Sequence, residues 1–277
     1  MRLDEIHIRD PFILTDGNKY YMYGTGKHTG GLGFDVYTSD DLVAWSEPRE
    51  VFRADDSFWA TRDFWAPEVH KYQGAYYMFA SFKHPDRCRA TQILRADRPD
   101  GRFAPIAEPA TPPDWECLDG TLYIEDGKPY IVFCHEWVQV HDGEIRALEL
   151  SDDLTHTVGE PKLLFRASEP EWALKGARDH VTDGPFMYRT KSGRLLMLWA
   201  SFSDSGYVEA IAASDNGRID GKWNHIGLLF RENGGHGMLF RALDGSLKFI
   251  LHQPNNSPHE RPKLFDVVDD GDTLRIV

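Results

Sequence analysis

The chain has few cysteines and no long apolar stretch. Its 277 residues include three cysteines, Cys88, Cys117 and Cys134, which are far apart and odd in number. They form neither a CxxC metal motif nor a disulfide framework, so reduced thiols are expected. No run approaches the length of a membrane span, and residues 1–7 lack the apolar core of a signal peptide. We expect a cytoplasmic protein, or a periplasmic or secreted one whose signal peptide has been removed.

Positive charge is scarce as well. The chain has 31 Lys and Arg against 44 Asp and Glu, a formal net charge of −13. This balance argues against nucleic acid or an anionic membrane surface as a partner. No Pro/Gly/Ser-rich linker divides the chain, and all-β folds often use such a length as one domain. Residues 1–277 are therefore expected to form a single domain.

Aromatic residues are abundant, at 13%, and they recur within a repeated unit. The unit is a strand, a turn with Gly or Asp, an aromatic-rich strand, a loop, a strand and a final polar strand. Short strands joined by Asp-Gly or Ser-Gly turns indicate hairpins rather than βαβ units. The copies open, at steps of 56, 53, 64 and 53 residues, at Asp10, Ala66, Asp119, Asp183 and His236.

A period of this size with about four strands is typical of a β-propeller blade. Five copies predict an all-β fold, a five-bladed β-propeller; a β-sandwich or two small β-domains is the alternative. In a propeller the innermost strands line a central channel, so residues far apart in sequence become neighbours there.

The strand entrances would bring Asp10, Asp119 and Asp183 to one mouth of the channel, with His236 from the last repeat. An Asp before Gly or Pro is an ordinary turn residue, but gathering like charges costs energy and favours a joint function. Paired carboxylates suit glycoside hydrolysis, in which one protonates the leaving oxygen and the other activates water or attacks the sugar. A third carboxylate raises the pKa of the acid by like-charge repulsion.

Two aromatic residues accompany these carboxylates. Trp65 and Phe12 stand beside the predicted mouth, and sugar rings offer C–H faces to aromatic rings. We expect both to contact a small-molecule carbohydrate substrate, although a core position for Trp65 is an alternative.

Several motifs resemble glycoside hydrolase family 43 over nearly the whole chain. They are Arg9-Asp10-Pro11-Phe12, Phe64-Trp65-Ala66-Pro67-Glu68-Val69, Leu118-Asp119-Gly120 and Ser39-Asp40-Asp41-Leu42 with Trp45. The resemblance implies a five-bladed propeller that inverts configuration at α-L-arabinofuranosyl or β-D-xylosyl linkages of plant polysaccharides or oligosaccharides. It also implies that Asp10 is the general base and that Asp119 orients and tunes the acid.

The acid position departs from the family pattern. The family usually carries a Glu-Gly-Pro motif, whereas this chain has Asp183-Gly184-Pro185. An Asp carboxyl reaches about 1.5 Å less far, the length of one C–C bond. Asp183 is the predicted acid; Glu136 is the main rival and otherwise a substrate contact, and Glu116 is a second rival.

The resemblance also implies a metal and a wall of the site. Gly235-His236-Gly237 resembles a motif whose histidine faces a central calcium ion through waters, so structural calcium at His236 is expected; a hydrogen-bonded channel histidine is the alternative. His252 and Arg261 resemble positions near the site wall. Arg261 is expected to contact substrate or hold a carboxylate in its charge state, and a surface ion pair is its alternative.

Other functions remain open at this stage. One is a non-catalytic glycan-binding propeller, which the Asp at the acid position keeps open. Another is a retaining, fructan-hydrolase-like glycosidase, and a third is a glycoside phosphorylase with a basic phosphate pocket.

Overall fold

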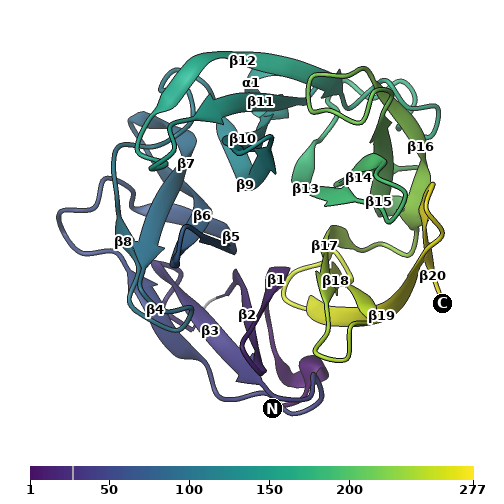
Figure 1. The fold of residues 1–277 in the computed structure, drawn as a ribbon. Coiled ribbons are helices and arrows are strands. Elements are labelled where there is room, and N and C mark those ends of the chain that lie inside the picture. Colours follow the sequence, from purple (N-terminus) through teal and green to yellow (C-terminus); the bar gives the residue numbers. More distant parts are fainter. Residues whose placement is uncertain (27) are drawn as a thin grey trace.

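The chain forms a ring of five sheets around a central channel (Figure 1). The computed structural model describes residues 1–26 and 28–277. Each sheet has four antiparallel strands taken in sequence order, so each blade is one repeat of the chain. The predicted all-β, five-bladed β-propeller is confirmed. No helix in the described part of the chain is both long and apolar enough to cross a membrane.

The blades have the following strands, each given from the channel outwards. Blade one holds β1 (Arg9–Asp16), β2 (Lys19–Thr25), β3 (Gly33–Ser39) and β4 (Arg49–Arg53); blade two β5 (Arg62–Tyr72), β6 (Ala75–His84), β7 (Arg87–Ala96) and β8 (Ala104–Pro105); blade three β9 (Cys117–Glu125), β10 (Lys128–His135), β11 (Glu144–Leu150) and β12 (Thr157–Arg166); blade four β13 (Asp183–Arg189), β14 (Leu195–Ser203), β15 (Gly206–Ser214) and β16 (Trp223–Phe230); blade five β17 (Gly235–Arg241), β18 (Leu247–Gln253), β19 (Arg261–Asp269) and β20 (Leu274–Ile276). The short helices are η1 (Leu3–Glu5) and α1 (Trp137–Val140).

Adjacent blades are held together mainly by apolar side chains packed between sheets. Between blades four and five, for example, Leu196 and Leu198 pack in one fully buried cluster with Phe249 and Leu251. Complete burial of each such side chain contributes about 1.5–3 kcal/mol. These interfaces fix the angular spacing of the blades, and therefore the positions of the inner strands at the channel.

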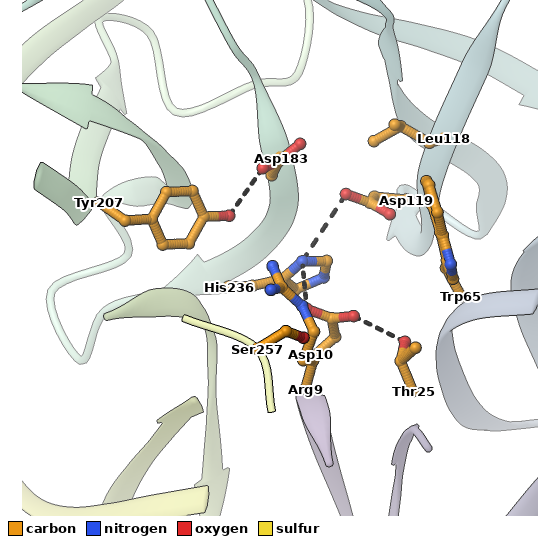
Figure 2. A pocket seen from close by; sticks show the side chains of 10 residues that line it. All are labelled: Arg9, Asp10, Thr25, Trp65, Leu118, Asp119, Asp183, Tyr207, His236 and Ser257. Carbon is orange, nitrogen blue, oxygen red and sulfur yellow. Dashed lines mark hydrogen bonds and ion pairs between the residues drawn. The ribbon is translucent and has the colours of Figure 1, made fainter. Parts of the chain in front are cut away.

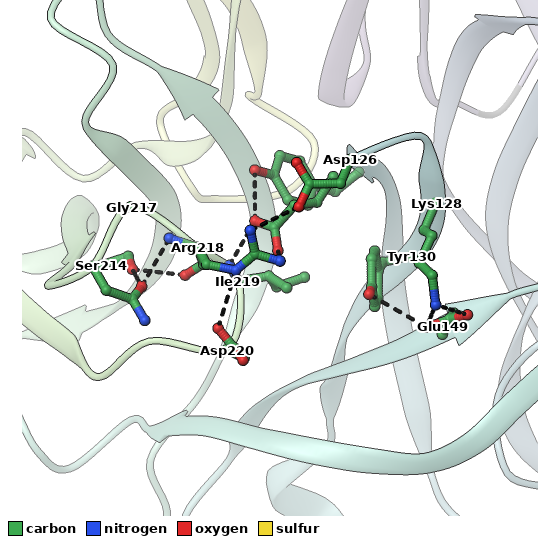
Figure 3. A network of polar contacts seen from close by, with 12 residues as sticks. Asp126, Lys128, Tyr130, Glu149, Ser214, Gly217, Arg218, Ile219 and Asp220 are labelled. Atoms are coloured by element: carbon green, nitrogen blue, oxygen red, sulfur yellow. Dashed lines mark hydrogen bonds and ion pairs between the residues drawn. The ribbon is translucent and has the colours of Figure 1, made fainter.

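A polar contact reinforces the junction of blades three and four (Figure 3). The Arg218 guanidinium pairs with Glu125 at 3.2 Å and with Asp126 at 2.7 Å. The backbone N–H of Ile219 donates to the buried Glu125 carboxylate at 2.9 Å. The β9–β10 turn is thus tied to the segment that follows β15.

Candidate active site

A cavity of about 390 Å³ opens at one mouth of the channel (Figure 2). Its walls come from every blade: Arg9, Asp10, Thr25, Trp65, Leu118, Asp119, Asp183, Tyr207, His236 and Ser257. The three aspartates expected at this mouth, together with His236, lie in it.

Each innermost strand has, near its start and at the same place in the repeat, a residue with left-handed backbone geometry. These residues are Asp10 (φ 51°), Ala66 (φ 46°), Asp119 (φ 54°), Gly184 (φ 49°) and His236 (φ 52°). The strand pairing of each blade shifts register around this point. Such bulges re-aim side chains, and non-glycine residues hold this geometry only where their surroundings impose it. Here the bulge turns the side chains of Asp10, Asp119 and His236 toward one another.

This geometry corrects one detail of the repeat alignment. The residue of blade four in register with Asp10 and Asp119 is Gly184, not Asp183. Asp183 precedes it and corresponds to Arg9, Trp65 and Leu118, which also line the cavity. Sequence alone favoured Asp183 because it carries the only carboxylate of the Asp-Gly pair. The acid candidate therefore enters the site from a different backbone position than the other two aspartates.

Asp10 is held by polar groups that favour its charged form. Thr25 donates its hydroxyl to Asp10 Oδ2 at 2.6 Å, and His236 Nδ1 lies 3.2 Å from Oδ1. Burial raises the pKa of Asp10, but the nearby His236 and Arg9 and the hydrogen bond from Thr25 lower it by more, so the net pKa is below its ordinary value. Asp10 is therefore a carboxylate at neutral pH.

His252 fixes the backbone of Asp10. The Asp10 N–H donates to His252 Nδ1 at 3.2 Å, and burial lowers the pKa of His252 to about 4. The imidazole is therefore neutral, with its proton on Nε2, facing Asn255 Oδ1 at 3.3 Å. The 3.4 Å approach of Nδ1 to Asp10 Oδ1 is a close contact rather than an ion pair, because Nδ1 carries a lone pair.

Asp119 connects the base side of the cavity to the acid side. Its Oδ2 accepts the Gly184 N–H at 3.0 Å and lies 3.7 Å from His236 Nδ1. Burial, followed by repulsion from Asp10, raises the pKa of Asp119 well above its ordinary value. Asp119 thus restrains the backbone next to Asp183.

Asp183 is set up as a proton donor. Its Oδ2 accepts a hydrogen bond from the Tyr207 hydroxyl at 2.8 Å (Figure 2). Burial and then the nearby Asp119 carboxyl raise the pKa of Asp183 to about 7. The pKa values of Asp10 and Asp183 are thus shifted in opposite directions, which is the pattern of a base and an acid working at one pH.

His236 fits among these groups because residue 184 is glycine. A Cβ added at Gly184 would lie 2.5 Å from His236 Cδ2. The Nδ1 atom already faces two carboxylates, and the described residues contain no group of three or more His, Cys, Asp or Glu side chains suited to a metal. Calcium bound at His236 through waters stays a prediction.

Glu136 lies behind the cavity wall rather than in it. Its buried carboxylate pairs with Arg89 at 3.1 Å, and the Arg89 guanidinium lies 4.0 Å from the ring centre of Trp65. Trp65 lines the cavity, as expected. Any effect of Glu136 on a substrate would pass through Arg89 and Trp65. Glu116, the second rival acid, instead pairs with Lys83.

Phe12 and Arg261 are also outside the lining. Phe12 is buried and packs edge-on against His70 and Phe186. Arg261 donates to the backbone oxygens of Asp4, Pro258 and Glu260, which anchors the segment between β18 and β19. Direct substrate contact by either residue stays a prediction.

Sequence reasoning did not single out Tyr207, Thr25 or Ser257 as site residues. A signal for Thr25 was available, because counting the hairpin register from the turn at Gly17 places the end of β2 near Arg9. Tyr207 lies on β15 and Ser257 between β18 and β19, and no local pattern distinguishes them.

Fold and site together define a glycosidase of the five-bladed β-propeller class. The model of the glycosyl hydrolases family 43 matches residues 5–267. The chain belongs to this family.

A solved structure described as an endo-arabinase from Bacteroides thetaiotaomicron VPI-5482 is 40% identical, with 99% of each chain covered and a TM-score of 0.91. A putative beta-xylosidase from Xylanibacter ruminicola is 29% identical over 44% of this chain and 23% of its own length. A xylosidase/arabinosidase 43A from Humicola insolens is 22% identical over 49% of this chain and 46% of its own length. The matches thus span about a quarter to a half of these two curated relatives.

Proposed function

We propose that the protein hydrolyses α-L-arabinofuranosyl or β-D-xylosyl linkages in plant polysaccharides or their oligosaccharides, with inversion of configuration. The observation that carries the proposal is the pair of carboxyl groups in one cavity, Asp10 with a lowered pKa and Asp183 with a pKa of about 7. Inverting glycosidases need one carboxylate and one carboxylic acid on opposite sides of the scissile bond.

Asp10 acts as the general base. It takes a proton from water as the water oxygen attacks the anomeric carbon. Thr25 and His236 hold its two oxygens in place at 2.6 and 3.2 Å, so the carboxylate is oriented before substrate binds.

Asp183 acts as the general acid. As the bond from the anomeric carbon to the leaving oxygen breaks, that oxygen takes the Asp183 proton. Asp119 supports this step because its carboxyl group raises the pKa of Asp183 and binds the Gly184 N–H. Proton exchange with solvent then returns Asp10 to its charged form and Asp183 to its neutral form.

We place arabinofuranosyl linkages first among the substrates. The solved structure that covers 99% of both chains at 40% identity is described as an endo-arabinase. Trp65 offers a flat apolar surface at the cavity, and Arg89 supports it from 4.0 Å.

The opposite pKa directions of Asp10 and Asp183 argue against a propeller that only binds glycans. A base and an acid with separated pKa values are a requirement of turnover, whereas binding needs neither. Family membership also disfavours a retaining, fructan-hydrolase-like mechanism.

The test is turnover of 4-nitrophenyl α-L-arabinofuranoside, 4-nitrophenyl β-D-xyloside and the matching oligosaccharides by wild type, Asp183→Asn and Glu136→Gln. If Asp183 is the acid, Asp183→Asn loses turnover on oligosaccharides and keeps much of it on the nitrophenyl glycosides, whose leaving group departs without protonation. The same signature in Glu136→Gln would assign the acid to Glu136. NMR of the first anomer released tests inversion, and wild type inert on all four substrates would refute the proposal.

Two further expectations go with this proposal. Activity that falls on chelation and returns with calcium would support a calcium ion near His236, and activity indifferent to chelation would argue against it. The compartment, cytoplasmic or exported, stays a prediction that fractionation of the source cells tests.

A further inference from the structure

Tyr207 contacts the acid candidate directly but lies outside every sequence motif of the site. It comes from β15, the third strand of blade four, and its side chain is almost fully buried. Its hydroxyl donates to Asp183 Oδ2 at 2.8 Å. Its ring stacks on the His252 ring, with centroids 5.7 Å apart and planes at 22°. The Phe202 ring also packs against the Tyr207 ring, with centroids 5.0 Å apart and planes at 56°.

The direction of this hydrogen bond distinguishes the two oxygens of Asp183. Burial and the adjacent Asp183 carboxyl raise the pKa of Tyr207 well above 10, so the phenol keeps its proton and acts as the donor. Asp183 Oδ2 is therefore the acceptor. A carboxylic acid carries one proton, and the oxygen that already accepts a hydrogen bond is the poorer place for it. The transferable proton is left to Oδ1.

We propose that Tyr207 is a positioning residue that fixes the Asp183 carboxyl and assigns its transferable proton to Oδ1. The inference rests on the proposed function, since it concerns the residue proposed as the acid. It adds a role for a side chain that no motif of the sequence marks.

A fixed orientation matters for a short acid side chain. The carboxyl torsion of Asp has a broad, roughly two-fold preference, so an unrestrained carboxyl would present either oxygen. The bond from Tyr207 selects one orientation. Asp183 also leaves the backbone one residue before the bulge at Gly184, unlike Asp10 and Asp119. The Tyr207 hydrogen bond thus fixes which oxygen this short side chain presents to the cavity.

Tyr207 also connects the acid to the base. His252, on which Tyr207 stacks, accepts the backbone N–H of Asp10. The charged and titratable groups that act on Asp183 are Tyr207 from β15, Asp119 from β9, His236 from β17 and Asp10 from β1. Of these, Tyr207 is the one with a hydrogen bond to the Asp183 side chain.

The experiment compares Tyr207→Phe with wild type and with Tyr23→Phe. Tyr23 is the matched control because it is equally buried and its hydroxyl donates to Pro99 O at 2.6 Å, remote from the cavity lining. Each variant is assayed for kcat and KM on an arabino-oligosaccharide and on 4-nitrophenyl α-L-arabinofuranoside across pH, with thermal melting to verify folding.

We expect Tyr207→Phe to lower kcat on the oligosaccharide by about 10- to 100-fold, the cost of misplacing a reacting group. KM should stay within about twofold, and kcat on the nitrophenyl glycoside should fall far less, because that leaving group needs no proton. The Tyr207 hydrogen bond lowers the pKa of Asp183, so its loss should raise that pKa. The alkaline limb of the pH profile of kcat should therefore move to higher pH. Tyr23→Phe should show none of these changes.

A second measurement keeps the inference open to refutation if Tyr207→Phe melts early. In an Asp183→Asn background, adding Tyr207→Phe should cost less than about twofold, since the group it positions is gone. Equal losses on both substrates, no movement of the alkaline limb, or a full further loss in the Asp183→Asn background would overturn the positioning role while leaving the proposed function intact. An inert wild type would overturn both.

Discussion

Replacing Gly184 by alanine tests whether the centre of the site is built on close packing. The added Cβ would lie 2.5 Å from His236 Cδ2 and 2.8 Å from its Cγ, closer than any ordinary contact. The residue also has φ +49°, where a side chain costs about 1–2 kcal/mol. Overpacking against the ring adds about 1–3 kcal/mol. The expected loss of folding free energy is about 2–5 kcal/mol.

Gly17→Ala is the matched control. Gly17 has a similar φ of +58°, but an added Cβ there would meet nothing within 4 Å. The expected loss of folding free energy in Gly17→Ala comes from backbone strain alone and is about 1–2 kcal/mol. At about 2–3 °C per kcal/mol for a chain of this size, Gly184→Ala should melt about 5–15 °C below wild type and Gly17→Ala about 2–6 °C below.

The two variants should differ more in catalytic activity than in stability. In Gly184→Ala, His236 must move from its place between Asp10 and Asp119, so we expect kcat to fall by at least about tenfold, whereas Gly17→Ala should keep wild-type kcat. Melting temperatures are measured by calorimetry and kcat on 4-nitrophenyl α-L-arabinofuranoside. If both variants melt together and both keep full kcat, the close packing of His236 on Gly184 is wrong.

Three further predictions follow from the site and the blade junction. Asp10→Asn should lower kcat by about 10²–10⁴-fold, the usual contribution of a general base, and near-normal turnover would refute that role. Asp183 must be protonated and its pKa is raised to about 7, so kcat/KM should fall about tenfold between pH 6 and pH 8. The lowered pKa of Asp10 places the fall of kcat/KM on the acid side below about pH 4. A kcat/KM that stays constant from pH 6 to pH 8 would contradict the assignment of Asp183 as the acid. Glu125→Ala should lower the free energy of unfolding by about 1–3 kcal/mol in a denaturant titration, because it leaves the Ile219 N–H unpaired. Arg218→Ala should lower it by about 1 kcal/mol or less, because the Arg218 side chain is half exposed. A larger loss in Arg218→Ala than in Glu125→Ala would show that the ion pair dominates.

The fold could be predicted from the sequence because the sequence signals for it are local and repeated. Each hairpin has its own turn residues, such as Gly17, and each inner strand its own apolar pattern, so five copies of one unit were visible without any long-range information. The placement of Asp10 and Asp119 at the channel followed from the same repetition.

Residues that act through partners distant in sequence were beyond such reasoning. The sequence predicts Glu136 as a rival acid or a substrate contact, and only the structure shows that it pairs with Arg89, which lies over the Trp65 ring. Phe12 lies two residues after Asp10 in sequence, and plain strand alternation would place both on one face; the bulge at Asp10 shifts the register before Phe12, whose ring is buried in the core. Proximity along the chain therefore overstated its closeness to the cavity.

The sequence by itself determined the repeat, the five blades and the identity of the carboxylates, since these depend on local patterns and on which residues open each copy. Tertiary structure alone decided that the blade-four register runs through Gly184, that Tyr207 binds Asp183, and that His252 holds the backbone of Asp10. The reason is physical: a bulge shifts a strand by one residue without any change in composition. Contacts between blades depend on ring closure, which brings together residues as far apart in the chain as 10 and 252.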